Sequence, residues 1–361
     1  MVLRSKRLTP DQPTPRWALA LLALSALGLV SASSGDRLEV FRSCVTSCES
    51  EPCSLSLLLR ALGWSCASNC AYQCSHTVTD LSDGGQLGYH QFFGKWAFCR
   101  VLGVQEPFSV LFSLGNLWVH WKGLKMLEKR VPDSNALKPW LKAAAWIQMN
   151  TWLWSSVFHT RDVPWTEKLD YFSAMITVAF MLLYALLRIF NIQTPSSSTS
   201  RPILRLLLSL LIGGFVLSHF IYVSSLPRFP YGYHVAVAMV LGTIGNVLWI
   251  LWSLSFVLEF PTLRIAGRTV GWPWPYGPNW NPHKSKRPKG AFTPAILTLL
   301  TTAAMSLELL DFPPILRAID AHSLWHLATI PLSMAWWDFL VRDTNDLQAL
   351  TGSPLSGSPK F

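Results

Sequence analysis

Charged side chains are scarce in this chain. Asp, Glu, Lys and Arg make up 14% of the 361 residues, whereas hydrophobic residues make up 50%. Soluble domains carry about 25% charged residues, so the composition indicates a membrane protein. The net charge is +10, but the basic residues lie between apolar segments and not on one polar face. This distribution argues against a nucleic-acid-binding protein and favours a topology signal.

Several motifs of well-known enzymes are also missing. The sequence contains no P-loop, no G-x-S-x-G nucleophile elbow and no N-x-[ST] glycosylation site. The chain is therefore neither a nucleotide hydrolase that uses a P-loop nor an α/β-type serine hydrolase that uses a G-x-S-x-G motif. Any catalytic function must rest on a different arrangement of side chains.

Cysteine is absent after Cys99. The six cysteines before it form two clusters, C-x3-C-x4-C and C-x3-C-x3-C, which comprise Cys44, Cys48, Cys53, Cys66, Cys70 and Cys74. In an oxidising compartment, six cysteines in a short segment predict three disulfides, with fifteen pairings open. A zinc cluster is the alternative, but the C-x-x-C spacing is absent. Cys99 is left over, and we expect a buried thiol near the first membrane span.

The first 34 residues resemble a signal peptide. Basic residues precede an apolar core from Trp17 to Val30, and the small residues Ser31–Ser34 follow it. This core is short for a membrane-spanning helix, which needs about 20 residues. Cleavage near Ser34 is expected, with a retained signal anchor as the alternative. Residues 35–94 would then form a lumenal cysteine-rich domain.

Apolar segments fill the rest of the chain and predict an all-α membrane protein, a bundle of seven transmembrane helices over residues 95–341. A cytosolic tail over 342–361 would follow. The second segment is the weakest, because Gln148 and Asn150 interrupt it. The expected spans are 109–126, 139–158, 167–190, 203–223, 235–257, 291–310 and 322–340.

Basic residues in the connections predict the topology. They concentrate in and around the first, third and fifth connections, while the second, fourth and sixth carry few. Cytosolic loops are enriched in Lys and Arg, so the odd connections are expected in the cytosol and the mature N-terminus in the lumen. Disulfides demand the same orientation. The fifth connection, which runs through Trp272–Pro275 and the basic segment His283–Arg287, is expected to contact anionic lipids, or alternatively a partner protein.

Five polar residues stand out within the apolar spans: Ser155, His159, Asp170, His322 and His326. Ser155 and His159 are four residues apart, as are His322 and His326, so each pair lies on one helix face. The predicted topology places all five at the lumenal ends of spans two, three and seven. Polar groups inside a membrane protein are costly and usually mark a functional site.

Three imidazoles are sufficient protein ligands for catalytic zinc and leave one position for a water molecule. Zinc lowers the pKa of such a water toward about 7. Asp170 would orient the water or act as a general base, and Ser155 would donate a hydrogen bond to an oxyanion. Each residue alone also has an ordinary explanation, such as packing, a bond within its own helix or a position near a helix start. His219 and His234 are expected to be structural.

Several long segments resemble the GPI-anchor-remodelling lipases. The segments are N-T-W-L-W-S-S-V-F-H-T-R-D-V-P-W-T-E-K-L-D-Y-F-S-A (150–174), L-E-L-L-D-F-P-P (307–314), D-A-H-S-L-W-H-L-A-T-I-P-L (320–332) and G-K-W-A-F-C-R-V-L-G-V-Q-E-P-F-S-V-L-F-S-L-G-N-L (94–117). This family belongs to the CREST superfamily of seven-span hydrolases, whose pattern is Ser-x3-His, a later Asp and a final His-x3-His. The resemblance implies that His159, His322 and His326 bind Zn2+, with Ser155 and Asp170 as catalytic residues.

The resemblance also implies a reaction, the phospholipase A2-type hydrolysis of the sn-2 acyl ester of protein-linked GPI. The substrates would be GPI-anchored proteins, and the location the endoplasmic reticulum membrane, with the Golgi as the alternative. A different lipid amidase or esterase of the superfamily, such as a ceramidase, stays open, as does a seven-span receptor with a structural metal. Ala97 and Phe93 depart from the family pattern near the first span. Glu308 and Asp311 would support the metal site or simply solvate a helix end.

Overall fold

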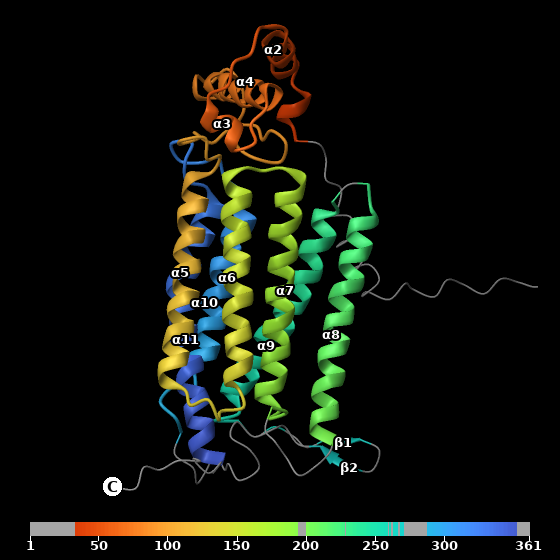
Figure 1. The fold of residues 1–361 in the computed structure, drawn as a ribbon, viewed down its shortest axis with the longest axis vertical. Coiled ribbons are helices and arrows are strands. Elements are labelled where there is room, and N and C mark those ends of the chain that lie inside the picture. Colours follow the sequence, from red (N-terminus) through yellow and green to blue (C-terminus); the bar gives the residue numbers. More distant parts are fainter. Residues whose placement is uncertain are drawn as a thin grey trace, which may run out of the picture.

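The computed structural model describes residues 33–193, 200–227, 229–258, 260, 263–265, 268–270 and 287–351. The expected signal peptide lies almost entirely outside the described residues, and so does most of the basic fifth connection. The described chain forms a small helical domain on one end of a bundle of long helices (Figure 1).

The small domain is held together by disulfides. It contains η1 (Gly35–Arg37), α2 (Glu39–Ser50), α3 (Leu57–Ala61) and α4 (Cys66–Asp83). Nested pairings join the two cysteine clusters: Cys44–Cys74, Cys48–Cys70 and Cys53–Cys66. The three predicted disulfides are thus confirmed. A domain this small buries little apolar surface, so covalent links between α2 and α4 take over part of its stabilisation.

Cys99 is unpaired as expected, but the prediction that its thiol is buried is wrong. The residue is exposed. It lies in the extended segment that precedes the first long helix, where its backbone N–H donates to the carbonyl of Arg317 at 2.8 Å. The backbone is therefore anchored, while the side chain is not covered by the long helices as we expected.

Seven long helices make up the bundle in the described part of the chain, and each overlaps one of the seven apolar segments. One short antiparallel hairpin, β1 (Leu263–Ile265) with β2 (Arg268–Val270), accompanies them. The helices are α5 (Pro107–Arg130), α6 (Lys138–Thr160), α7 (Pro164–Ile189), α8 (Ser200–Ser225), α9 (Tyr231–Leu254), α10 (Thr293–Leu310) and α11 (Ala321–Thr351). The helix α11 ends at Thr351 and not near Leu340, so it extends into the segment expected to be a tail.

The helices mark the chain as a membrane protein. Among the described residues, α7, α8 and α9 are long and apolar enough to cross a membrane. On α8, large apolar side chains such as Leu210 and Leu211 are more than 60% exposed, which suits contact with lipid and not with water. The count of seven spans remains a prediction, because α5, α6, α10 and α11 carry more polar residues or shorter apolar stretches.

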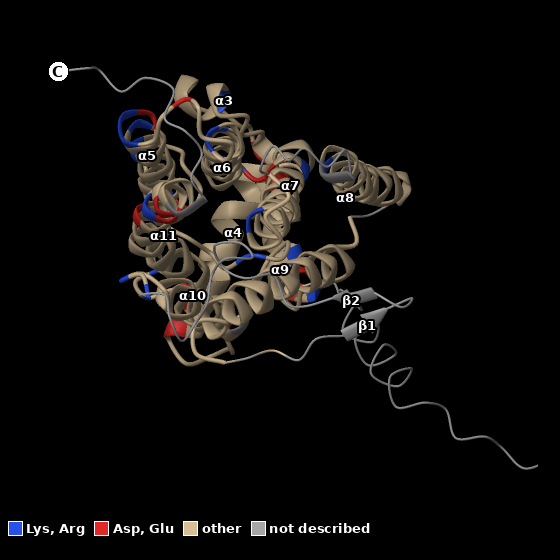
Figure 2. Ribbon diagram, turned by 90° about the horizontal axis from the view of Figure 1, so that it is seen from below, with Lys and Arg blue, Asp and Glu red and all other residues tan. Residues whose placement is uncertain are grey.

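The end of the bundle away from the disulfide domain carries many of the basic side chains, as Figure 2 shows around α5 and α6. Nearby, a fully buried ion pair joins α7 and α11. Two nitrogens of Arg188, Nε and one Nη, each donate to the carboxylate of Asp343 at 2.6 Å. Farther up the bundle, α5 and α11 approach closely at Gly123, where an added Cβ would collide with the Trp337 ring. These contacts fix α11 against its neighbours.

Candidate metal centre

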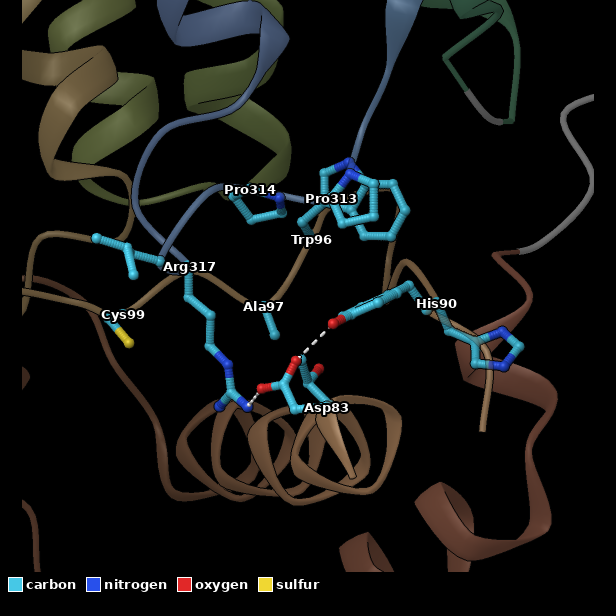
Figure 3. A pocket seen from close by; sticks show the side chains of 11 residues that line it. Asp83, His90, Trp96, Ala97, Cys99, Pro313, Pro314 and Arg317 are labelled. Atoms are coloured by element: carbon cyan, nitrogen blue, oxygen red, sulfur yellow. Dashed lines mark hydrogen bonds and ion pairs between the residues drawn. The ribbon is translucent and has the colours of Figure 1, made fainter. Parts of the chain in front are cut away.

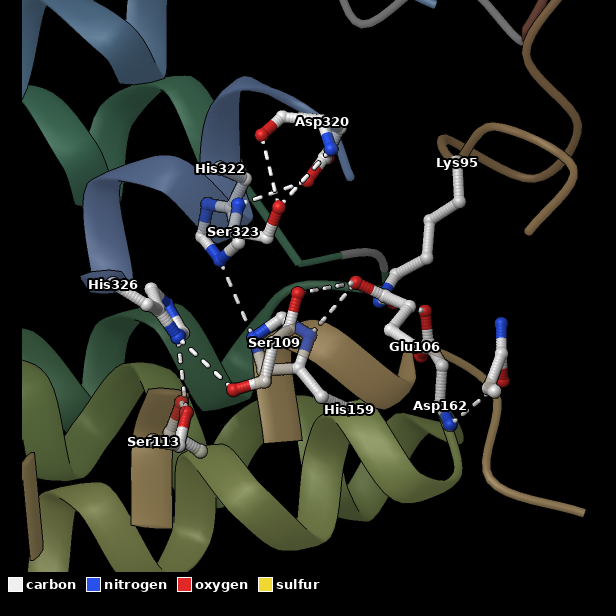
Figure 4. A network of polar contacts seen from close by, with 12 residues as sticks. Lys95, Glu106, Ser109, Ser113, His159, Asp162, Asp320, His322, Ser323 and His326 are labelled. Carbon is white, nitrogen blue, oxygen red and sulfur yellow. Dashed lines mark hydrogen bonds and ion pairs between the residues drawn. The ribbon is translucent and has the colours of Figure 1, made fainter. Parts of the chain in front are cut away.

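Three histidines from two helices converge at the end of the bundle beneath the disulfide domain (Figure 4). One ligand atom from each of His159, His322 and His326 lies within 4.8 Å of the other two. His159 belongs to α6 and the other two to α11, where their spacing of four residues puts them on one face. His159 and His326 are buried, and His322 is half-buried. The three histidines predicted as a set are therefore brought together.

The distances within the group suit a shared cation. The Nε2 atoms of His159 and His322 are 3.3 Å apart. Two imidazole nitrogens bound to one tetrahedral zinc at about 2.0–2.1 Å would be about 3.3–3.4 Å apart. No cysteine or carboxylate joins the group within the described residues. A donor set of three imidazoles is the one that catalytic zinc sites use, so the residues present fit the metal.

Hydrogen bonds orient the first imidazole. Nδ1 of His159 lies 2.9 Å from a carboxylate oxygen of Glu106, at the start of α5, and both side chains are buried. A carboxylate accepts, so Nδ1 carries the hydrogen and Nε2 presents its lone pair to the group of three. Metal-binding histidines usually have such a carboxylate behind them. Glu106 thus completes the pattern of a metal centre.

Charge around Glu106 keeps it ionised. Its other carboxylate oxygen is paired with the ammonium of Lys95, which also lies 3.3 Å from Asp162. Burial alone would raise the pKa of Glu106, but Lys95 and His159 together lower it below its usual value. Because Lys95 also caps the ring of Phe158 at 4.0 Å, its position is fixed from two sides.

Ser113 connects Ser155 to the third histidine. The Ser113 hydroxyl on α5 lies 3.0 Å from the Ser155 hydroxyl and 2.9 Å from Nδ1 of His326. Both serines are buried. Ser155 is therefore linked to the imidazole of His326 through one intervening hydroxyl. Its neighbour Ser156 instead donates to the carbonyl of Trp152 in its own helix at 2.8 Å.

Asp170 lies on α7 at the level of Ser155. Thr151, one turn before Ser155, donates to the carbonyl of Ser173 at 2.8 Å, and the Ser173 hydroxyl donates to the carbonyl of Asp170. The helices α6 and α7 run antiparallel. One helical turn from the Thr151–Ser173 contact toward the disulfide domain therefore leads to Ser155 on α6 and to Asp170 on α7. Asp170 is outside the group of three and on the neighbouring helix.

The structure adds residues that the sequence reasoning missed. Glu106, Ser109, Ser113 and Asn116 form a stripe on the bundle-facing side of α5, at alternating steps of three and four residues. Asn116 donates to the backbone carbonyl of His326 at 2.8 Å, and Nδ1 of His326 also lies 3.4 Å from the carbonyl of Ser109. This periodicity was the available signal. Serine and asparagine are unremarkable singly, but four on one face of an apolar span indicate a polar interior.

The disulfide domain is fastened to the loop before α11. The Asp311 carboxylate accepts from Trp96 Nε1 and from Gln91 Nε2, each at 2.9 Å. Arg317 pairs with Asp80 at 2.6 Å and also with Asp83, both on α4. Asp311 therefore does more than solvate a helix end, because its carboxylate joins the loop before α11 to residues 91 and 96. The Glu308 side chain lies outside the described residues, so its role stays a prediction.

The pair of histidines expected to be structural, His219 and His234, is separate from this centre. Nε2 of His219 on α8 lies 2.9 Å from Nδ1 of His234 on α9, and Nε2 of His234 lies 3.1 Å from the carbonyl of Tyr171. Both imidazoles are buried among aromatic rings, among them Phe229 at 5.3 Å from His234. The structure thus gives them a role in joining α7, α8 and α9.

Comparisons with known proteins show which sequences this chain is similar to. The model of the Per1-like family matches residues 56–344. A Schizosaccharomyces pombe protein named PER1 homolog is 36% identical over 332 residues, covering 89% of this chain and 90% of its own length. The cattle protein GPI-specific phospholipase A2-like PGAP3 is 33% identical, covering 91% and 95%. Post-GPI attachment to proteins factor 3 of Drosophila melanogaster is also 33% identical, covering 89% and 92%. No solved structure matches.

Proposed function

The chain belongs to the Per1-like family, and from that premise we propose that it remodels GPI anchors by hydrolysing the sn-2 acyl ester of protein-linked GPI. The reaction is of the phospholipase A2 type. Relatives named GPI-specific phospholipase A2-like or post-GPI attachment factor support the substrate class. The observation that carries the proposal is the convergence of His159, His322 and His326 beneath the disulfide domain.

A bound metal ion would supply the reactivity of this site. Zn2+ held by the three imidazoles would supply a Lewis acid for the ester carbonyl and would make a water molecule acidic enough to attack near neutral pH. The protein's own contribution is to fix the imidazoles. Glu106 holds Nδ1 of His159, and Ser113 holds Nδ1 of His326, so that both Nε2 atoms stay directed at one point.

Two further side chains stabilise the oxyanion and transfer the proton of the attacking water. Ser155 shares a hydrogen bond with Ser113 and lies one turn before His159, so its hydroxyl is placed to donate to the oxyanion that forms from the ester carbonyl. Asp170, on the adjacent helix, takes a proton from the attacking water and returns it to the leaving glycerol oxygen. An acyl-enzyme on Ser155 is disfavoured, because Ser113 stands between Ser155 and the imidazole of His326.

The depth of the site suits the substrate. The three histidines lie near the ends of α6 and α11, where the helices meet the disulfide domain. In the proposed topology this is the lumenal membrane interface, where the glycerol esters of a lipid lie while its acyl chains stay in the bilayer. The bundle would shelter the chains, and the anchored protein would remain outside. We place the chain in the endoplasmic reticulum membrane, with the Golgi membrane as the alternative.

Lipid analysis of GPI-anchored proteins tests the proposal. Cells that lack the endogenous activity are supplied with the wild-type chain or with His326→Ala, and the acyl chains of a purified GPI-anchored protein are identified by mass spectrometry. We expect remodelled sn-2 chains with wild type and the unremodelled chain with His326→Ala. A normally remodelled sn-2 chain with His326→Ala, at equal protein level, would refute the phospholipase function.

A further inference from the structure

A cavity of about 610 Å3 lies between the disulfide domain and the loop that joins α10 to α11 (Figure 3). One wall is formed by α4, by Tyr89 and His90, and by Trp96, Ala97 and Cys99; the other is formed by Pro313, Pro314, Leu316 and Arg317. Its volume falls within the range of ligand pockets, about 300–1,000 Å3. The three histidines, Ser155 and Asp170 do not line it. The cavity is therefore a second feature, separate from the metal centre.

Residues next to these walls in the sequence nevertheless contact the candidate metal centre or the start of α11. Trp96 on one wall directly follows Lys95, whose ammonium is paired with Glu106 behind His159. Arg317 on the other wall lies shortly before Asp320, whose carboxylate caps the start of α11 by accepting from the backbone N–H of Ser323 at 2.8 Å. A lipid with its ester at the histidines would have its headgroup close to this cavity.

The lining combines aromatic faces with fixed polar groups. The side chain of Tyr89 is 50% exposed, and the Trp96 ring is held in place by its bond to Asp311. Asp83 accepts from the Tyr89 hydroxyl at 2.7 Å and from Arg317. A carboxylate has about four acceptor positions, so Asp83 can accept further hydrogen bonds from a ligand.

This combination is suited to a carbohydrate. Sugar rings present apolar C–H faces, which can pack on Tyr89 and Trp96, and a periphery of hydroxyl groups, which can bond to Asp83 and Arg317. An acyl chain is disfavoured because charged side chains form part of the wall and the cavity lies beyond the helix ends. The polar walls lie on the same side of the bundle as the disulfide domain, where a lipid glycan would extend.

We propose that this cavity is the binding site for the glycan of the GPI headgroup, and that it lets the protein select GPI over ordinary phospholipids. The inference rests on the proposed function, because it takes GPI as the substrate. It assigns selectivity to the junction between the disulfide domain and the α10–α11 loop, whereas the ester is handled at the histidines. Substrate selection and chemistry are then separate in space.

Binding of the free glycan tests this assignment. The probe is the lipid-free glycan that phosphatidylinositol-specific phospholipase C and protease digestion release from a GPI-anchored protein, titrated calorimetrically into the full chain in detergent micelles. We expect saturable binding to wild type and at least a tenfold weaker affinity for Tyr89→Ala. Leu316→Trp, which enlarges a 90% exposed residue at the cavity, should weaken binding similarly. Phe93→Ala, the matched control, removes a 69% exposed aromatic ring outside the lining and should stay within twofold of wild type.

The outcomes separate this inference from the proposed function. His326→Ala should bind the glycan as tightly as wild type, although it should not hydrolyse the lipid. If wild type binds no glycan, or if Tyr89→Ala and Leu316→Trp both bind it like wild type, the glycan site is wrong even where hydrolysis is intact. If wild type binds the glycan through Tyr89 but hydrolyses no ester, the phospholipase function fails while the glycan site stands. Protease resistance of the disulfide domain confirms that each variant is folded.

Discussion

The carboxylate of Glu106 accepts a hydrogen bond from Nδ1 of His159 at 2.9 Å, and both side chains are buried. The contact joins the start of α5 to the end of α6. Backbone bonds support it, since the N–H of Glu106 donates to the carbonyl of His159 at 3.0 Å. The segment before α5 is therefore part of the candidate metal centre, and it fixes which nitrogen of His159 faces the other two histidines.

Replacing Glu106 tests this relationship. Glu106→Gln removes the negative charge that fixes the imidazole, and loss of such an outer carboxylate typically weakens metal affinity by about 10–100-fold. We expect a loss of that size in zinc affinity, measured by competition with a chelator of known affinity. Glu128→Gln is the matched control, since Glu128 pairs with Lys125 at the far end of α5. Equal zinc affinities for the two variants would remove Glu106 from the site.

The neighbouring serines Ser155 and Ser156 provide a second comparison. Ser155 bonds to Ser113 beside His326, whereas Ser156 bonds to its own helix. Removal of an oxyanion donor typically costs about 10²–10³ in rate. Ser155→Ala should therefore lower kcat for release of the sn-2 chain by about that factor, with bound zinc unchanged. Ser156→Ala should keep near-normal kcat. A similar effect of both substitutions would show that Ser155 has no special role in catalysis.

Much of the fold could be predicted from the sequence. Each of the seven apolar segments overlaps one long helix. A helix satisfies its backbone groups within itself, so a local apolar segment is enough to predict it. The cysteine clusters predicted three disulfides, but their nested pairing depends on how α2 and α4 pack. The end of α11 was misplaced because the polar residues after Leu340 do not stop a helix, and those such as Asp343 are buried against other helices.

The candidate site was predicted in part, for a similar reason. Four-residue spacing and loop charges brought the three histidines together correctly. Glu106 and Ser113 were missed, because each contacts a histidine far away in the chain, and the polar periodicity of α5 does not by itself identify those partners. The contacts that Asp311 and Arg317 make also depend on docking of the disulfide domain, which no sequence pattern indicates. Contacts between residues far apart in the chain could therefore not be predicted from the sequence.

The ion pair between Arg188 and Asp343 predicts a large effect on stability. Both side chains are at most 1% exposed. Breaking a buried pair costs about 3–5 kcal/mol, because the remaining charge loses its compensation. We expect Asp343→Asn to destabilise the protein by that amount in denaturant unfolding. The exposed pair between Asp338 and Arg342 on the same helix is the control, and Asp338→Asn should cost about 1 kcal/mol or less. Equal costs would contradict the assigned burial.

Docking of the disulfide domain should depend on pH through His76. Burial lowers the pKa of His76; the Phe98 carbonyl, which accepts from Nε2, raises it; and the Arg317 guanidinium lowers it. The net pKa lies below the usual value of about 6.5. The unfolded state therefore binds more protons in the window below about 6.5, so stability falls as the pH falls through it.

Hydrogen exchange of α4 at pH 7.5 and pH 5.5 measures this effect. We expect a smaller protection factor at the lower pH in wild type, where the protection factor is the intrinsic exchange rate at that pH divided by the observed rate. His76→Gln, which cannot take up a proton there, should show a smaller difference between the two pH values. An equal or larger difference in His76→Gln would assign the pH dependence to another group.

Metal removal from the purified chain tests the central claim most directly. The protein is stripped with a chelator, and release of the sn-2 fatty acid from a GPI-anchored protein is followed before and after addition of one equivalent of Zn2+. We expect release to stop on stripping and to return with zinc in wild type, but not in a chain with His159→Ala, His322→Ala and His326→Ala. Undiminished release from the zinc-free protein would contradict a metal-dependent phospholipase.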